Sequence, residues 1–114
     1  MPILNSLNEM HPEITKWRRE LHQKPELQYD VFETAEFVVK KLKEFGVDEV
    51  ITGLGQTGVV GIIKGNLGEG KTVGLRADMD ALPIEEISGK PWASKISGKM
   101  HACGHDGHTS MLLG

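Results

Sequence analysis

The residues best suited to chemistry lie in the segment 101–108, whose sequence is HACGHDGH. It holds one thiol, three imidazoles and one carboxylate, from Cys103, His101, His105, His108 and Asp106. Thiolate and imidazole together are ligands for zinc, and they also suit cobalt or nickel. The segment therefore predicts a metal site. The alternative is a loop of surface histidines with a buried cysteine ahead of a helix.

A second polar cluster, RADMDALP at 76–83, directly follows an expected strand over 72–77. In open α/β sheets, ligands bind beyond the carboxyl ends of the strands. Asp78 and Asp80 stand on alternate residues there and could orient a metal ion or its ligands. Taken alone, this cluster favours a polar strand end with an Arg–Asp pair. Together with 101–108 it favours a metal site.

The segment 53–58, GLGQTG, matches the dinucleotide-binding pattern G-x-G-x-x-G, and Asp78 lies 20 residues beyond Gly58. That fingerprint must open a helix whose N-terminus holds the pyrophosphate. The residues that follow, VVGII at 59–63, are typical of a strand instead. The glycines therefore predict a hairpin or tight turn and not a cofactor loop.

Two amphipathic helices are expected ahead of these clusters. The first has apolar residues at helical spacing, Met10, Ile14, Trp17 and Leu21. Pro12 is expected in its first turn. The helix should end near Lys24, because Pro25 disfavours a helical conformation for the residue before it.

The second helix has a candidate N-cap in Asp30, with Glu33 three residues on, which is a capping-box pattern. Its expected buried stripe consists of Val31, Ala35, Val38, Leu42 and Phe45. Gly46 stands where a C-terminal cap belongs.

The hydrophobic periodicity changes after Gly46. Strands are expected over 49–54, 58–64 and 72–77, which are rich in Val and Ile and bounded by glycines. The middle one is apolar on both faces, which indicates a central strand. A last helix is expected to begin near His108. The expected fold class is α/β, with helices packed on a mixed sheet of at least three strands.

Composition narrows the function classes. The 114 residues include 13 Lys and Arg against 16 Asp and Glu, a net charge of −3. Weak acidity with few aromatic residues argues against nucleic-acid binding. No apolar run approaches the roughly 18 residues of a membrane-spanning helix, and the N-terminus lacks a signal-peptide pattern. Cys103 is the only cysteine, so no internal disulfide can form. We expect a cytoplasmic protein.

Four segments resemble the M20 metallopeptidase family, specifically its amidohydrolase branch of N-acyl-L-amino-acid amidohydrolases, hippurate hydrolases and plant auxin-conjugate hydrolases. They are WRRELHQKPEL at 17–27, GVVGIIKG at 58–65, GLRADMDALPI at 74–84 and KMHACGHDGHT at 99–109. The segments follow the family's order, and the resemblance covers essentially the whole chain. It implies part of the catalytic domain of a dizinc-peptidase-like α/β fold.

The resemblance also implies site residues. Family members hold two divalent metal ions, for which zinc, manganese, cobalt and nickel are all open, and the Cys-x-His pair maps onto Cys103 and His105 as ligands. Asp80 maps onto the catalytic residue that would orient a ligating imidazole. Among the remaining histidines, His108 is expected to cap or pack the last helix. His11 and His22 are expected to be structural. Asp78 and His101 lie within the motifs but receive no definite role.

The implied reaction is carboxypeptidase-like, metal-assisted hydrolysis of an amide bond in N-acyl amino acids or small peptides. The general-base glutamate, the remaining ligands and a dimerisation and lid domain are expected outside residues 1–114. These residues would then be the N-terminal portion of the catalytic domain of a homodimeric parent, inactive alone. Glu85 and Glu86 are expected to be loop carboxylates.

Two other functions are compatible with the residues alone. Cys103 could be the nucleophile of a hydrolase, with a neighbouring histidine as its base. The chain could also be a non-enzymatic metal-binding or interaction module. Neither alternative explains the two long motifs at 74–84 and 99–109.

Overall fold

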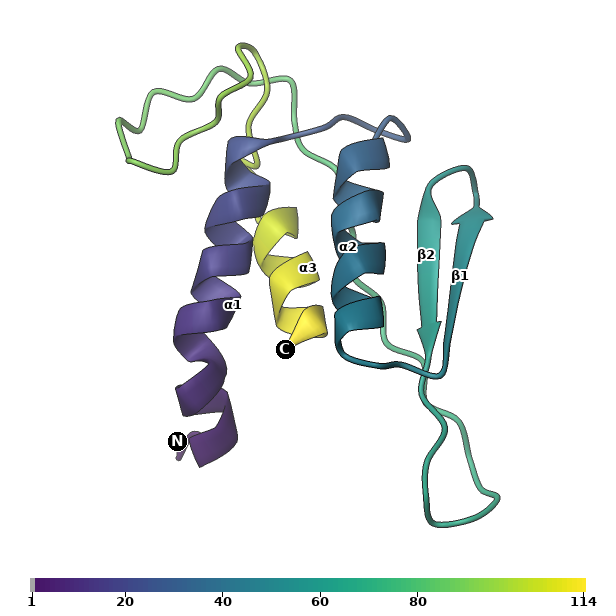
Figure 1. Ribbon diagram of the computed structural model, residues 1–114. Helices are drawn as coiled ribbons and strands as arrows, with labels where there is room; N and C mark the ends of the chain where they lie inside the picture. Colours follow the sequence, from purple (N-terminus) through teal and green to yellow (C-terminus); the bar gives the residue numbers. More distant parts are fainter. Residues whose placement is uncertain (1) are drawn as a thin grey trace.

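The computed structural model describes residues 2–114, which form three helices and one β-hairpin. In chain order the elements are α1 (Asn5–Gln23), α2 (Phe32–Glu44), β1 (Glu49–Leu54), β2 (Gly58–Ile62) and α3 (His105–Leu113). α3 lies between α1 and α2, and the hairpin packs on the other side of α2 (Figure 1). Within the described residues, no helix is both long enough and apolar enough to cross a membrane.

The apolar side of α1 packs against α3 and reaches the end of α2. Trp17 and Leu21 are buried, and the Trp17 ring lies 5.5 Å from the ring of Phe45, a distance typical of tilted aromatic pairs. α1 ends at Gln23, which confirms the predicted end near Lys24.

The position predicted for Pro12 is wrong. α1 begins at Asn5, so Pro12 lies inside the helix rather than in its first turn. A proline in a helix cannot donate to the carbonyl four residues earlier, here that of Asn8. Both residues are exposed, so water can satisfy this carbonyl.

The start of α2 also differs from the prediction. The expected capping box of Asp30 and Glu33 is wrong, because the N-cap position is Val31, which makes no side-chain cap. The carboxylate of Glu26 instead accepts the backbone N–H groups of Glu33 at 3.1 Å and Thr34 at 2.6 Å. Glu26 thus satisfies two of the N–H groups that an α-helix leaves unpaired at its N-terminus.

The end of α2 matches the prediction. Gly46 follows the last helical turn with φ of +74°, a conformation that glycine adopts without the steric cost of a side chain. Of the expected buried stripe, Val31 is buried, whereas Phe45 is 46% exposed.

β1 and β2 form an antiparallel hairpin with Glu49 opposite Ile62 and Leu54 opposite Gly58. The connecting residues 55–57 form the turn, and Gly55 takes a positive φ of 54°. The G-x-G-x-x-G segment is therefore a hairpin connection, as predicted.

The α/β class is confirmed, but the sheet has two strands and not three or more, and it is antiparallel rather than mixed. β2 is consequently an edge strand within residues 2–114, not a central one. Residues 72–77 form no strand there: Val73 and Leu75 are 80% and 76% exposed, and neither finds a paired neighbour. A strand requires backbone partners as well as suitable side chains, and β propensity alone did not supply them.

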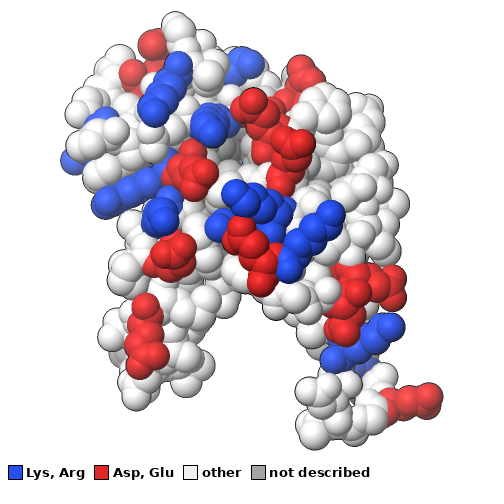
Figure 2. All heavy atoms as spheres, viewed as in Figure 1, with Lys and Arg blue, Asp and Glu red and all other residues white. Residues whose placement is uncertain are grey.

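Acidic and basic side chains gather together over the middle of the face shown in Figure 2, whose upper right-hand part is largely uncharged. Acidic and basic groups alternate across the middle, without one dominant patch of either sign. This agrees with the small net charge of −3.

Candidate metal centre

The first turn of α3 brings two histidines onto one side of the helix. α3 begins at His105, three residues earlier than predicted, directly after Gly104 with φ of +116°. Such a φ favours glycine, because a Cβ would collide with the backbone. Because side chains three residues apart are neighbours on a helix surface, His105 and His108 lie together. Their ring centroids are 5.3 Å apart.

The acidic segment 78–82 is held beside this turn by backbone bonds. Leu82 and Met100 exchange N–H···O bonds of 2.9 and 3.0 Å, and the N–H of Ala81 donates to the carbonyl of Glu26 at 2.7 Å. From α3, the Thr109 hydroxyl donates to the carbonyl of Asp78 at 2.8 Å. Three separate segments therefore determine where the carboxylates of 78–80 lie.

Asp78, His105 and His108 form a cluster with ligand atoms that all lie within 4.8 Å of one another. His108 Nδ1 is 2.7 Å from one carboxylate oxygen of Asp78, and His105 Nε2 is 3.6 Å from the other. The hydrogen bond from His108 is the main cause that holds the pKa of Asp78 below its ordinary value, against the opposing effect of burial. Asp78 is therefore a carboxylate at neutral pH, with oxygen atoms suited to a cation.

Asp80 orients the imidazole of His105. The ring Nδ1 lies 2.9 Å from both the backbone carbonyl and the carboxylate of Asp80. Two acceptors at one nitrogen place the ring proton on Nδ1 and leave the lone pair of Nε2 free to ligate a metal. This is the arrangement that the resemblance implied for Asp80, although its catalytic role stays a prediction.

Known proteins are similar to this chain in sequence and fold. Residues 74–114, which contain both polar clusters, match the profile of peptidase family M20/M25/M40. Hippurate hydrolase of Campylobacter jejuni is 49% identical over 99% of this chain and 29% of its own length. Thermostable carboxypeptidase 2 of Saccharolobus solfataricus is 50% identical over 96% of this chain and 28% of its own length. A Bacillus subtilis crystal structure, that of a dinuclear metal binding peptidase from the M20 family, superposes with a TM-score of 0.86 at 40% identity, over 93% of this chain and 29% of that one.

The chain is thus similar to M20 peptidases, by family profile over residues 74–114 and by fold over 93% of its length.

The chain spans less than a third of the length of these relatives. Its three helices and hairpin nevertheless follow the M20 fold over almost their full extent. The Bacillus subtilis protein of that structure is a dinuclear metal binding peptidase.

The donor set of this chain fits a divalent metal ion. It combines the free Nε2 of His105 and the ionised carboxylate of Asp78, which are intermediate and hard ligands for divalent metals. Cys103 is exposed on the loop before α3 and is not among the three clustered residues. Its predicted role as a ligand is therefore still a prediction.

The structure assigns His101 and His108 different surroundings. His101 is 4% exposed, and neither ring nitrogen has a hydrogen-bond partner among the described residues. Burial is the main cause that lowers the pKa of His101, so this ring is neutral near pH 7. His108 is half-exposed and bonded to Asp78, and it does not cap or pack the helix as expected.

Sequence reasoning missed the grouping of Asp78 with His108. The helix was expected to start near His108, which hid the spacing of three between the two histidines. A helix that starts directly after Gly104, a residue suited to positive φ, would place both rings on one face. The partnership with Asp78 carries no local signal, since it spans 30 residues.

Proposed function

We propose that this chain supplies part of the metal centre of an enzyme that hydrolyses amide bonds in N-acyl amino acids or related small amides. The observation that carries the proposal is the arrangement of Asp80, His105 and Asp78 within the M20 fold. In it, one carboxylate sets the tautomer of an imidazole, whose free nitrogen faces a second, ionised carboxylate.

Cys103 and His105 are the proposed metal ligands. His105 presents Nε2, because Asp80 accepts the proton of Nδ1. Cys103 stands two residues earlier on an exposed loop, where its thiol is accessible to an incoming ion. Asp78 and His108, which lie beside His105 Nε2, are available to bind the ion or a water molecule on it.

A divalent metal ion at such a site would lower the pKa of a bound water and stabilise negative charge on the amide oxygen. We propose that residues of this chain hold and orient the metal ion, and that neither Glu85 nor Glu86 is the general base. Glu86 is engaged through both carboxylate oxygens, with His22, the hydroxyl of Ser88 and the N–H of Ser94. Glu85 accepts bonds from Ser97 and Gly98 at the surface.

Since the chain spans 28–29% of the length of its M20 relatives, we propose that residues 1–114 are an N-terminal portion of the catalytic domain. The general base, further ligands and a dimerisation and lid domain would come from the remaining length of a homodimeric enzyme. Residues 1–114 alone would then not hydrolyse amides. The choice among zinc, manganese, cobalt and nickel, the substrate within this class and the cytoplasmic location also stay predictions.

The test is the metal content and metal affinity of the purified chain beside its Cys103→Ala/His105→Ala variant. His11→Ala is the matched control, because it removes an exposed imidazole from α1, outside the clustered residues. We expect zinc, cobalt or nickel to bind to the wild type and the control but not to the double variant. Equal binding by the double variant would show that the ligands are other residues.

A further inference from the structure

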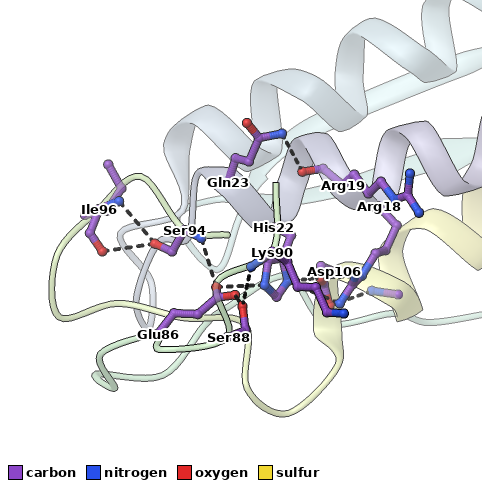
Figure 3. Close-up of polar contacts among 11 residues, drawn as sticks. Arg18, Arg19, His22, Gln23, Glu86, Ser88, Lys90, Ser94, Ile96 and Asp106 are labelled. Carbon is purple, nitrogen blue, oxygen red and sulfur yellow. Dashed lines mark hydrogen bonds and ion pairs between the residues drawn. The ribbon is translucent and has the colours of Figure 1, made fainter. Parts of the chain in front are cut away.

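The metal centre does not explain the motif at 17–27. One residue of this motif, His22, contacts Asp106, the residue that follows His105. His22 is 3% exposed on α1 and contacts two carboxylates from distant parts of the chain. They are Asp106 in the first turn of α3 and Glu86 in the long loop before it (Figure 3).

Each ring nitrogen of His22 faces one carboxylate. Nδ1 lies 2.7 Å from Oδ2 of Asp106, and Nε2 lies 2.9 Å from Oε1 of Glu86. Both distances are those of charge-assisted hydrogen bonds from a protonated nitrogen to a carboxylate oxygen. A neutral imidazole has only one N–H, so one carboxylate would face a nitrogen lone pair.

Arg18 offers a different partner, which the distances disfavour. Its Nη2 lies 3.3 Å from His22 Nδ1 and could donate only if that nitrogen were unprotonated. The contact of Nδ1 with Asp106 is 0.6 Å shorter. Arg18 satisfies its charge elsewhere, with Nε 2.9 Å from the same Asp106 oxygen.

A cationic His22 would balance the charges of the two carboxylates and of Arg18, which surround it. The side chains of Asp106 and Glu86 are 1% and 3% exposed. Burial acts to raise the pKa of Glu86, but its hydrogen bonds from Ser88, Ser94 and His22 prevail and lower it. Two carboxylates are then offset by Arg18 and an imidazolium. A neutral ring would leave an uncompensated buried charge, which is strongly unfavourable.

The other groups that face His22 agree with this assignment. The ring of His101 lies 6.3 Å away, centroid to centroid, and its burial keeps it neutral. No second cation therefore competes with His22 on this side.

These contacts link His22 to the metal centre through α3. Asp106 immediately follows His105, its carboxylate accepts the N–H of Gly107, and its backbone carbonyl accepts the Ser110 hydroxyl at 2.7 Å. Any shift of Asp106 would move the first turn of α3. Glu86 holds the N–H of Ser94 at 2.8 Å and so anchors the loop that leads to residues 101–105.

We propose that His22 is a positioning residue, held as an imidazolium between Asp106 and Glu86, and that this bridge fixes the orientation of His105 in the metal centre. The proposal rests on the metal-binding role proposed above. His22 does not touch the metal or the substrate; it acts through α3 and the loop before it.

Two measurements on the purified chain test the bridge. The first is ¹⁵N NMR of the imidazole nitrogens at pH 7, with the His22 signals assigned by their loss in His22→Gln. We expect both nitrogens of His22 to be protonated. An unprotonated ring nitrogen would overturn the proposal.

The second measurement is cobalt(II) affinity. Glutamine can donate to only one of the two carboxylates, so His22→Gln should bind cobalt more weakly than the wild type does. His11→Gln, on the exposed side of α1, should bind as the wild type does. Wild-type affinity in His22→Gln would refute the positioning role.

A further variant covers the case in which His22→Gln does not fold. Glu86→Gln keeps the shape of the side chain but removes its charge, so Nε2 of His22 should lose its proton in the NMR spectrum while Nδ1 keeps its own. A cationic His22 in this variant would contradict the argument from charge balance. Failure of the wild type to bind cobalt through Cys103 and His105 would refute the proposed metal centre. The positioning role of His22 would then be refuted as well. The NMR result alone decides the charge of His22.

Discussion

Removal of the Asp80 carboxylate should weaken metal binding by a limited and calculable amount. His105 Nδ1 has two acceptors on Asp80, the carboxylate and the backbone carbonyl, both at 2.9 Å. Asp80→Ala deletes the first and keeps the second. The ring proton therefore still has an acceptor, and Nε2 still offers its lone pair to the metal.

The magnitude follows from this partial loss. Removing the partner behind a ligating histidine costs about 10- to 100-fold in metal affinity. Because the carbonyl remains, we expect a loss near the lower limit, about 10-fold or about 1.4 kcal/mol. His105→Ala should lose more, because it removes the ligand itself.

The assay is calorimetric titration of the purified chain with zinc or cobalt. Asp30→Asn is the control, since it neutralises an exposed carboxylate between α1 and α2. Unchanged affinity in Asp80→Ala would refute the orienting role. A loss well beyond 100-fold would also contradict the reasoning, because it would mean that Asp80 binds the metal directly.

Three other predictions concern the elements that position the site. Glu26→Ala should lower the free energy of unfolding by about 1–2 kcal/mol in urea denaturation, because the α2 N-terminus loses its cap; wild-type stability would show that water replaces the carboxylate without cost. Gly104→Ala should destabilise by about 1–2 kcal/mol, because φ of +116° is strained for alanine, whereas Gly107→Ala inside α3 should be neutral or stabilising; equal effects would refute the role of φ. The lowered pKa of Glu86 means that its carboxylate stabilises the fold above its ordinary value of 4.5, and that this contribution disappears as pH falls through the lower folded value. Glu86→Gln should therefore be less stable than wild type at pH 7 and equally stable well below pH 4.5, and a constant difference across pH would contradict this.

Features with local causes could be predicted from the sequence. Pro25 indicated the end of α1, and Gly46 indicated the end of α2. The strand-like residues after Gly58 distinguished a hairpin from a dinucleotide loop. In each case the deciding physics acts within a few residues, through a fixed proline φ, a positive glycine φ or alternation along a strand.

Features that depend on distant partners could not be predicted in this way. The cap of α2 comes from Glu26, outside the usual capping window, because the turn between the helices folds back. Residues 72–77 have strand-like side chains but no neighbouring strand within residues 2–114. Strand formation depends on such a neighbour, and the residues themselves do not reveal it.

In the candidate site, too, some features could be predicted from the sequence, and others depend on contacts between distant residues. The resemblance pointed to Asp80 and His105, and the structure places them in contact. The meeting of Asp78 with His108 depends on where α3 starts and on the backbone bonds of 78–82. His22 was expected to be structural, and its two carboxylate partners, 64 and 84 residues away, emerged only from the packing of α1 on α3.

The most direct test of the central claim is the absorption spectrum of the chain with one equivalent of cobalt(II), recorded for the wild type and for Cys103→Ser. A thiolate bound to cobalt gives a charge-transfer band that oxygen and nitrogen ligands do not. We predict this band in the wild type, its absence in Cys103→Ser, and its weakening in His105→Ala. A cobalt complex of the wild type without the band would contradict the assignment of Cys103 as a ligand and leave the cluster of Asp78, His105 and His108 as the metal site.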